Sequence, residues 1–338
     1  MIARCALRQV EEIGTTAQVK PPMRRVALIY NPVSGQYSAR RRAAIEKALA
    51  VFREAGVTAD ALETTEAGEA TIHARQAASD GYDTILACGG DGTVHEILQS
   101  LVGTDVALGV IPLGTANALA ADLKLIGAPA KIARKLLEAE PARISVGRIH
   151  YQDLAGNPGS RYFIVAAGIG ADALLMSRLD ARLKRRLGYV LYLIEALHIW
   201  ATSSFPLFEA SLPENGNGGV RVVDISQLLA VRVHSFGGVL NKLAPGASLR
   251  NGNLSLLAFK TQSRLRYLSF LLAALAGRHT FNGAVELLET PSIDCRARNG
   301  ARETLFVEAD GEVLGLLPVQ MEVVPQSLTL LVPHGAQP

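Results

Sequence analysis

The most informative part of this sequence for the fold is Ile85-Leu-Ala-Cys-Gly-Gly-Asp-Gly-Thr-Val-His-Glu96. An apolar run enters a turn with three glycines in four residues, and a helical pattern follows. A buried strand that leads through such a turn into a helix is typical of parallel sheets. Glycines without Cβ let backbone N–H groups approach a polyanion closely, and the helix N-terminus adds a favourable dipole. The alternative is an ordinary tight turn in which Thr93 caps the helix.

The neighbouring segments repeat this alternation of strand and helix. We expect strands at residues 25–30, 57–62, 83–88 and 107–111, and helices at 38–55, 67–79, 93–102 and 116–123. This spacing predicts βαβ units around a parallel sheet, whose ligands bind beyond the carboxyl ends of the strands. The sequence therefore predicts a nucleotide-binding α/β domain over residues 24–143.

Two further strand-to-helix turns carry polar residues. One is Tyr30-Asn-Pro-Val-Ser-Gly35, and the other is Gly109-Val-Ile-Pro-Leu-Gly-Thr-Ala-Asn117. Asn31 and Ser34 could bind nucleotide phosphates or ribose, although an Asn-Pro turn is the plain alternative. We expect Thr115 and Asn117 to face the same crevice. Asp91 cannot bind phosphate directly, so it either orients its loop or holds a magnesium ion.

The rhythm changes after residue 143. We expect strands at 144–149, 162–167, 208–212, 220–233, 254–259, 285–295 and 305–309, with helices at 174–179, 187–201 and 266–276. Residues 144–318 thus predict a mainly antiparallel β domain. We expect the stretch 319–332 to rejoin the first domain, and residues 1–23 to form a flexible tail.

Composition limits the classes of function. The chain has 338 residues, enough for two domains, and 34 basic against 31 acidic residues give a net charge of +3. This balance is too mild to argue for nucleic-acid binding. Cys5, Cys88 and Cys295 form no metal-spaced pair, and no apolar run is long enough to span a membrane. We expect a cytoplasmic protein.

The order and spacing of five motifs resemble the diacylglycerol kinase catalytic-domain family. The motifs are Asn31-Pro-x-Ser-Gly35, Gly89-Gly-Asp-Gly-Thr93, Pro112-x-Gly-Thr-Ala-Asn117, the segment Phe236–Ser248 and Asp310-Gly-Glu312. The resemblance covers residues 24–332. It implies a Rossmann-like parallel-sheet nucleotide domain followed by a mainly antiparallel β-sandwich domain. It also implies an ATP-dependent kinase whose acceptor is diacylglycerol, ceramide or a sphingoid base.

The resemblance further implies the roles of individual residues. Asp310 would accept the proton of the lipid hydroxyl, and Glu312 would share that role or bind metal. Asp91 and Glu312 are the candidate Mg²⁺ ligands. ATP contacts are expected from Asn31, Pro32, Ser34, Gly35, Thr65, Gly89, Gly90, Gly92, Thr93, His95, Gly114, Thr115 and Asn117. If residues 308–312 stay extended, Asp310 and Glu312 share one face.

Two positions depart from the family pattern. Arg250-Asn251-Gly252 stands where members often carry an acidic residue, which puts a magnesium site of some bacterial members in doubt. His95 stands where Asn is frequent. We interpret it as a helix-surface or phosphate-side substitution and not as a metal ligand.

A basic segment predicts contact with a membrane surface. Arg178, Arg182, Lys184, Arg185 and Arg186 outnumber Asp180, and an apolar helical pattern follows. Such a segment can dock onto anionic lipid at the inner face of the membrane, while a solvated basic loop is the alternative. We expect a lipid partner at a membrane surface, no nucleic acid, and leave a homodimer open.

Two rival functions remain at this point. A kinase of a soluble acceptor, such as NAD kinase, shares the Gly-Gly-Asp-Gly-Thr loop, but the loops at 31–35 and 114–117 favour the lipid family. A non-catalytic lipid or nucleotide sensor would keep the fold, but the intact Asp91, Asp310 and Glu312 argue against it.

Overall fold

A computed structural model describes residues 23–32, 38–178, 189–214, 219–236, 243–275, 283–298 and 305–337. The tail at 1–22, Ser34, Gly35 and the basic residues from Arg182 to Arg186 lie outside this set, as do residues 237–242 of the segment Phe236–Ser248. The predictions made for those residues therefore stay predictions.

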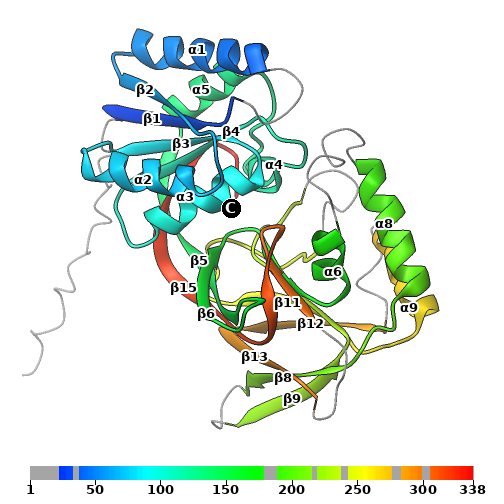
Figure 1. Ribbon diagram of the computed structural model, residues 1–338. Helices are drawn as coiled ribbons and strands as arrows, with labels where there is room; N and C mark the ends of the chain where they lie inside the picture. The colour runs from blue at the N-terminus through cyan, green and yellow to red at the C-terminus, as the bar shows by residue number, and fades with distance from the viewer. Residues whose placement is uncertain are drawn as a thin grey trace, which may run out of the picture.

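A four-stranded parallel sheet forms the first part of the chain. The strands run in the order β2 (Thr58–Glu63), β1 (Arg25–Tyr30), β3 (Thr84–Gly89) and β4 (Ala107–Pro112). Helices α1 (Ser38–Glu54) and α5 (Pro129–Leu137) lie on one side of this sheet, and α2 (Glu69–Ser79) and α3 (Asp91–Leu101) lie on the other (Figure 1). The predicted alternation of strands and helices is confirmed here.

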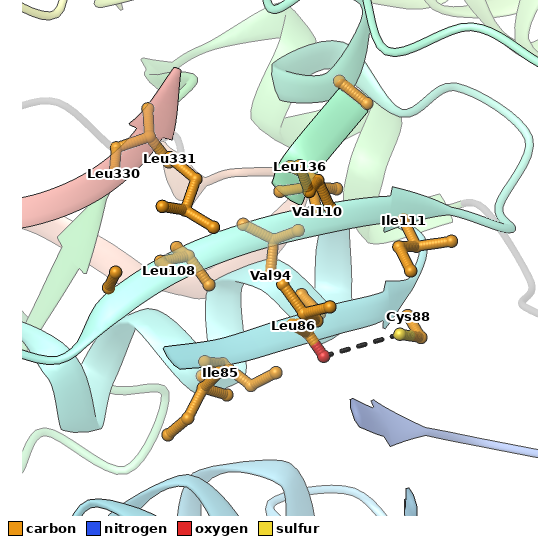
Figure 2. Packing of buried hydrophobic residues seen from close by; sticks show 14 of the residues in the cluster. Ile85, Leu86, Cys88, Val94, Leu108, Val110, Ile111, Leu136, Leu330 and Leu331 are labelled. Atoms are coloured by element: carbon orange, nitrogen blue, oxygen red, sulfur yellow. Dashed lines mark hydrogen bonds between the residues drawn. The ribbon is translucent and has the colours of Figure 1, made fainter. Parts of the chain in front are cut away.

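Burial of the strands on both faces explains their continuous apolar runs. Figure 2 shows Leu86 of β3 and Val110 of β4 packed with Leu136 of α5. All three side chains are nearly or fully buried, as are most residues of the two strands. Because helices cover both faces of the sheet, no alternation of polar and apolar residues is needed.

Helix α5 was not among the predicted elements. It begins with Pro129 at its first turn, where the missing N–H costs no hydrogen bond, and it buries Ile132, Ala133 and Leu136. Helix α4 (Ala118–Asp122) is shorter than the predicted span 116–123 because Asn117 adopts a left-handed conformation at its start.

The last strand joins the two halves of the molecule. β15 (Glu312–Val332) pairs in parallel with β4 at Thr329 and antiparallel along most of β5 (Glu140–Gln152). The register shifts twice along β15, at segments that contain Pro318 and Pro325. Proline lacks the N–H that a sheet needs, so a long strand accommodates it where pairing is irregular.

Antiparallel strands make up the second half. Outward from β15 the order is β14, β7, β10, β11, β12, while β13, β8 and β9 branch from β15 and β6 pairs with β5. Their bounds are β6 Pro158–Phe163, β7 Ala166–Ile169, β8 Phe208–Pro213, β9 Val220–Ile225, β10 Gln227–Val231, β11 Leu254–Phe259, β12 Val285–Thr290, β13 Ser292–Ala297 and β14 Phe306–Ala309. A parallel α/β part followed by a mainly antiparallel β part confirms the predicted fold class.

Three predicted long strands are each split in two. The segment 220–233 contains β9 and β10, which pair with different neighbours, β8 and β11. Ser226 stands at the break, where its hydroxyl donates to the carbonyls of Phe259 and Thr261. The segments 162–167 and 285–295 are interrupted in the same way. Apolar runs that cross from one sheet branch to another look continuous in sequence.

Helices α6 (Ala171–Arg178), α8 (Tyr189–Thr202) and α9 (Arg264–Leu275) lie together beside the β-rich half (Figure 1). The indole N–H of Trp200 in α8 donates to the carbonyl of Arg264 at the start of α9. Within the residues described above, we find no helix long and apolar enough to cross a membrane.

Candidate active site

The carboxyl ends of β1, β3 and β4 lie at one edge of the parallel sheet, because these strands lie side by side. The loops after β3 and β4 meet there. The N–H of Leu113 donates to the carbonyl of Gly89 at 2.8 Å. A Cβ on Gly114 would lie 2.5 Å from the Cα of Gly90. The two loops therefore touch through glycine backbones, and any side chain at Gly114 would push them apart.

Asp91 fixes the geometry between these two loops. Its carboxylate accepts the backbone N–H of Asn117 at 3.0 Å and that of Ala118 at 2.8 Å. The Asn117 side chain in turn binds the N–H and the carbonyl of Gly114. Of the two roles predicted for Asp91, these contacts support loop orientation, since both carboxylate oxygens hold the start of α4.

Helix α3 begins directly behind the glycine turn. Gly90 occupies the position before the first helical residue and is extended, with no side-chain hydrogen bond capping the helix. A Cβ on Gly89 would lie 2.3 Å from the Thr93 hydroxyl oxygen, so only glycine fits there. Thr93 is half-buried, while Gly114 and Thr115 are exposed. The start of a helix, with its N–H groups and the positive end of its dipole, is suited to a phosphate.

The other residues predicted to contact ATP lie around the same edge. Asn31 and Pro32 follow β1 directly. Thr65 is exposed after β2, and its N–H and hydroxyl donate to the carboxylate of Glu69. Arg41 of α1, which was not predicted, donates to the carbonyl of Leu113 and brings a cation beside the loop after β4.

The acidic motif forms a tight hairpin, so the condition under which Asp310 and Glu312 would share one strand face is not met. Asp310 and Gly311 connect β14 to β15, with φ angles of 49° and 85°. Two successive residues with positive φ make the two-residue turn that suits the twist of a hairpin, and Asp-Gly is a preferred sequence for it. The candidate general base, Asp310, therefore lies at the tip of this hairpin.

The carboxylate of Asp310 is enclosed, with 1% of its side chain exposed. Its Oδ1 accepts the N–H groups of Val165 at 2.8 Å and Ala166 at 3.1 Å. Its Oδ2 accepts the N–H of Ile164 at 3.0 Å and lies 3.2 Å from Nδ1 of His95. The link between β6 and β7 thus grips the hairpin from one side, and α3 grips it from the other.

His95 is buried, with 2% of its side chain exposed, so the prediction of a helix-surface residue is wrong. Its ring meets Asp310 of the β-rich half, whereas Val94, Ile97 and Leu98 of the same helix pack in the core of the parallel half. Burial alone would lower the pKa of His95, but the hydrogen bond to Asp310 and the charges of Asp310 and Glu312 outweigh burial and raise it. His95 supports Asp310 and does not line the loop surface.

Glu312 is exposed and approaches the glycine turn. A Cβ on Gly92 would lie 3.5 Å from Oε1 of Glu312. The hairpin thus brings one carboxylate of the β-rich half to the start of α3. In the described part of the chain, no group of three or more His, Cys, Asp or Glu side chains is arranged to hold a metal ion.

A pair of buried carboxyl groups lies beneath the hairpin. A Cβ on Gly168 would clash with Oδ2 of Asp172 and lie 2.9 Å from Oε1 of Glu308. Glu308 accepts the N–H of Gly311, whereas the enclosed oxygens of Asp172 have no hydrogen-bond partner among the described residues. Burial raises the pKa of Asp172 to about 7. Burial and the charge of Asp172 raise the pKa of Glu308 well above its usual value.

A buried arginine occupies the region near Arg250-Asn251-Gly252. Arg232 is fully buried, and its guanidinium donates to the carbonyls of Ser145, Leu249, Asn251 and Asn253. Burial lowers the pKa of Arg232 to about 10. The backbone oxygens of this loop thus surround an internal cation.

A cavity of about 280 Å³ lies away from the glycine turn after β3 and the loop after β4. Its walls come from α6, from the segment after α8 and from the start of β14, and include Leu174, Phe205, Ser226 and Phe306. None of the predicted site residues lines it. Phe306 and Asp310 stand at opposite ends of β14, so roughly 13 Å of strand separates the cavity from the hairpin tip.

Contacts between residues far apart in sequence carry most of what sequence reasoning missed. His95 and Asp310 are 215 positions apart, and Asp122 of α4 accepts the N–H of Ser235 across 113 positions. Burial raises the pKa of Asp122 to about 6. The sequence offered one signal for these contacts: His95 and Asp122 stand in predicted helices at positions that become buried. A buried polar side chain needs a hydrogen-bond partner, which must then come from another segment.

Comparison with known proteins covers both halves. Residues 25–149 match the family model described as the diacylglycerol kinase catalytic domain. Residues 164–332 match the model described as the YegS C-terminal NAD kinase beta sandwich-like domain. Together the two models reach from β1 to the end of β15.

Individual relatives align along nearly their whole length. A protein of Bacillus subtilis (strain 168) named diacylglycerol kinase is 30% identical over 302 residues, covering 88% of this chain and 92% of its own. A protein of Chromohalobacter salexigens named a probable YegS-like lipid kinase is 31% identical over 299 residues, covering 86% and 89%.

Solved structures share the fold. A crystal structure from Bacillus anthracis str. Sterne aligns with a TM-score of 0.74 at 22% identity, covering 95% of this chain and 99% of that one. Another from the same organism, named a diacylglycerol kinase, gives a TM-score of 0.64 at 18% identity and covers 93% and 98%. At these identities the likeness concerns the arrangement of the chain.

Proposed function

Because this chain belongs to the diacylglycerol kinase family, we propose that it transfers the γ-phosphoryl group of ATP to the hydroxyl of a membrane lipid. The acceptor class comprises diacylglycerol, ceramide and sphingoid bases. One observation carries the proposal: the hairpin with Asp310 and Glu312 meets the helix that starts at the glycine turn. A proton acceptor and a phosphate-type loop thereby lie on two sides of one site.

Backbone N–H groups at the start of α3 and the loop after β4 are suited to the ATP phosphates. The close contact of Gly90 with Gly114 leaves no side chain between these two loops. Asp91 and Asn117 fix the two loops relative to each other through hydrogen bonds to the backbone of Asn117 and Gly114. Phosphoryl transfer depends mostly on such positioning and on charge stabilisation.

A magnesium ion fits this site when it is shared with the nucleotide. Mg²⁺ is commonly held by one or two carboxylates together with substrate phosphates and water. Glu312 is exposed beside Gly92 and could supply one such carboxylate, whereas Asp91 is engaged with two backbone N–H groups. The ion would neutralise charge on the β- and γ-phosphates.

In the proposed reaction, the lipid hydroxyl oxygen attacks the γ-phosphorus and its proton passes to the carboxylate of Asp310. The bond between the γ-phosphorus and the bridging oxygen breaks, and ADP leaves with that electron pair. The hydrogen bonds from Ile164, Val165 and Ala166 hold the Asp310 carboxylate in one orientation throughout. A fixed acceptor near the reacting oxygen is what general-base catalysis requires.

The surface of α8 and α9 supports a lipid acceptor presented by a membrane. Leu197, Leu265 and Leu272 are 53%, 75% and 57% exposed. Arg264 and Arg266 lie exposed beside Leu265 at the start of α9. Apolar side chains next to arginines fit a membrane interface with anionic lipid. Thr202 at the end of α8 lines the same cavity as Phe306, so a lipid tail could extend toward it.

A transfer assay with radiolabelled ATP tests the proposal. Diacylglycerol, ceramide and sphingosine would be presented separately in mixed micelles, with NAD as the soluble acceptor. We expect label in at least one lipid and none in NAD. Label in NAD alone would favour a kinase of a soluble acceptor, and label in none would argue against a kinase.

A further inference from the structure

The acceptor capacity of the Asp310 carboxylate is already filled. A carboxylate offers about four lone-pair positions. The N–H groups of Val165 and Ala166 take those of Oδ1, and the N–H of Ile164 takes one of Oδ2. The remaining position of Oδ2 faces Nδ1 of His95 at 3.2 Å.

The four donors are not equivalent. Three belong to consecutive residues of one backbone segment, which also accepts the N–H of Asp310 at the carbonyl of Ala166. That segment and the hairpin belong to the same half of the molecule, so they move together. The fourth donor, His95, belongs to α3, the helix that begins at the glycine turn after β3. Separation of α3 from the hairpin would free one position on Oδ2 and leave the other three bonds intact.

The hydrogen bond also defines the state of the imidazole. For Nδ1 to donate, it must carry a proton, and Nε2 is then an acceptor or carries a second proton. Nε2 is enclosed and has no hydrogen-bond partner among the described residues. The orientation of His95 therefore serves Asp310, because among the described residues its side chain makes a hydrogen bond only to that carboxylate.

We propose that His95 is a positioning residue that holds Oδ2 of Asp310 and yields this position to the hydroxyl of the lipid acceptor. This inference rests on the proposed lipid kinase function. The hydroxyl takes the place of the Nδ1–H on Oδ2 and passes its proton there as its oxygen bonds to the γ-phosphorus. ADP leaves as described above, and no proton is transferred from His95.

Two substitutions at His95 distinguish the effect of its hydrogen-bond donor from the effect of its side-chain volume. His95→Asn keeps an amide donor close to where Nδ1 stands, whereas His95→Leu has a similar size and no donor. The bond from His95 exists only before the lipid binds, so its loss should appear in kcat/KM for the lipid, which reports the free enzyme. With saturating ATP, we expect His95→Leu to lower this kcat/KM by about 10- to 100-fold, the range that misplacement of a catalytic group produces. The KM for ATP should stay within about twofold. His95→Asn should recover most of the lost kcat/KM.

A stability measurement on each variant keeps the test decisive. Rates are referred to the folded fraction, obtained from urea unfolding at the assay temperature. A merely structural histidine predicts equal loss of stability in both variants and an unchanged kcat/KM for the lipid per folded molecule. A wild-type kcat/KM in folded His95→Leu, or equal loss in His95→Asn and His95→Leu, would overturn the inference. A wild-type chain that labels no lipid would instead overturn the proposed function.

Discussion

The carboxylate of Asp91 accepts the backbone N–H of Asn117 at 3.0 Å, which ties the glycine turn after β3 to the loop after β4. The same carboxylate binds the N–H of Ala118, so it satisfies two donors at the start of α4. A single side chain thus fixes the spacing between two loops that are suited to phosphate.

Asp91→Ala should abolish phosphoryl transfer. Loss of the carboxylate leaves the N–H groups of Asn117 and Ala118 unpaired, and the two loops can separate. We expect activity to fall at least 100-fold, with little change for Asp105→Ala, whose side chain is fully exposed. The assay is lipid phosphorylation with a folded-state check by circular dichroism. Near-normal turnover in folded Asp91→Ala would show that this loop does not bind the nucleotide.

Local patterns in the sequence predict the parallel half well. Buried strands such as Arg25–Tyr30 are continuous apolar runs, and glycine-rich turns follow the strands that lie side by side in the sheet. The positions of the loops after β3 and β4 at one edge followed from this order. Family resemblance added the pairing of this edge with the acidic motif.

The interior of the site could not be predicted, because its contacts join distant segments. His95 reads as a helix residue beside a loop, and only the fold places Asp310 against it. The Asp310-Gly311 turn carries a recognisable hairpin signal, but the alternating acids at 308, 310 and 312 suggested a strand instead. Patterns with period two do not distinguish a strand from a hairpin tip.

Asp172 makes stability depend on pH in a direction opposite to that of an ordinary salt-bridged acid. Its pKa is raised to about 7 in the folded chain, so the folded state binds a proton that the unfolded state releases above pH of about 4. Stability should therefore fall as pH rises from about 4 to 7. Asp172→Asn should remove much of this loss.

The measurement is the Tm of the wild type and of Asp172→Asn at several pH values between 4 and 8. We expect the difference, variant minus wild type, to rise with pH over that range. Asp105→Asn is the matched control at an exposed position and should show no such trend. A difference that stays constant with pH would contradict a protonated Asp172.

Exposed leucines on α9 should anchor the chain to membranes. The double change Leu265→Asn and Leu272→Asn removes two apolar side chains spaced seven residues apart on one helix face. We expect co-sedimentation with anionic vesicles to weaken by about tenfold or more. Ile72→Asn, at an exposed position on α2, is the control. Equal binding of the double variant and the wild type would place the membrane contact elsewhere.

Glu312→Gln should alter the magnesium dependence of the reaction. The neutral amide keeps the size of the side chain but is a weaker ligand for a hard cation. We expect the Mg²⁺ concentration for half-maximal rate to rise about tenfold, with partial recovery at high Mg²⁺. Glu66→Gln, at an exposed position after β2, should leave the titration unchanged. A lower rate with an unchanged titration would assign Glu312 another role.

The proposal that Asp310 is the general base of a lipid kinase is best tested by the rate of lipid phosphorylation by Asp310→Asn. Asparagine keeps the shape of the side chain but does not accept a proton, and loss of a general base typically costs about 10²- to 10⁴-fold in rate. ATP affinity, measured by calorimetry, should persist because the nucleotide loops lie in the other half of the chain. We expect the wild type to phosphorylate a lipid, and we expect Asp310→Asn to bind ATP but to be slower by that factor. Near-normal turnover in Asp310→Asn would show that Asp310 is not the general base.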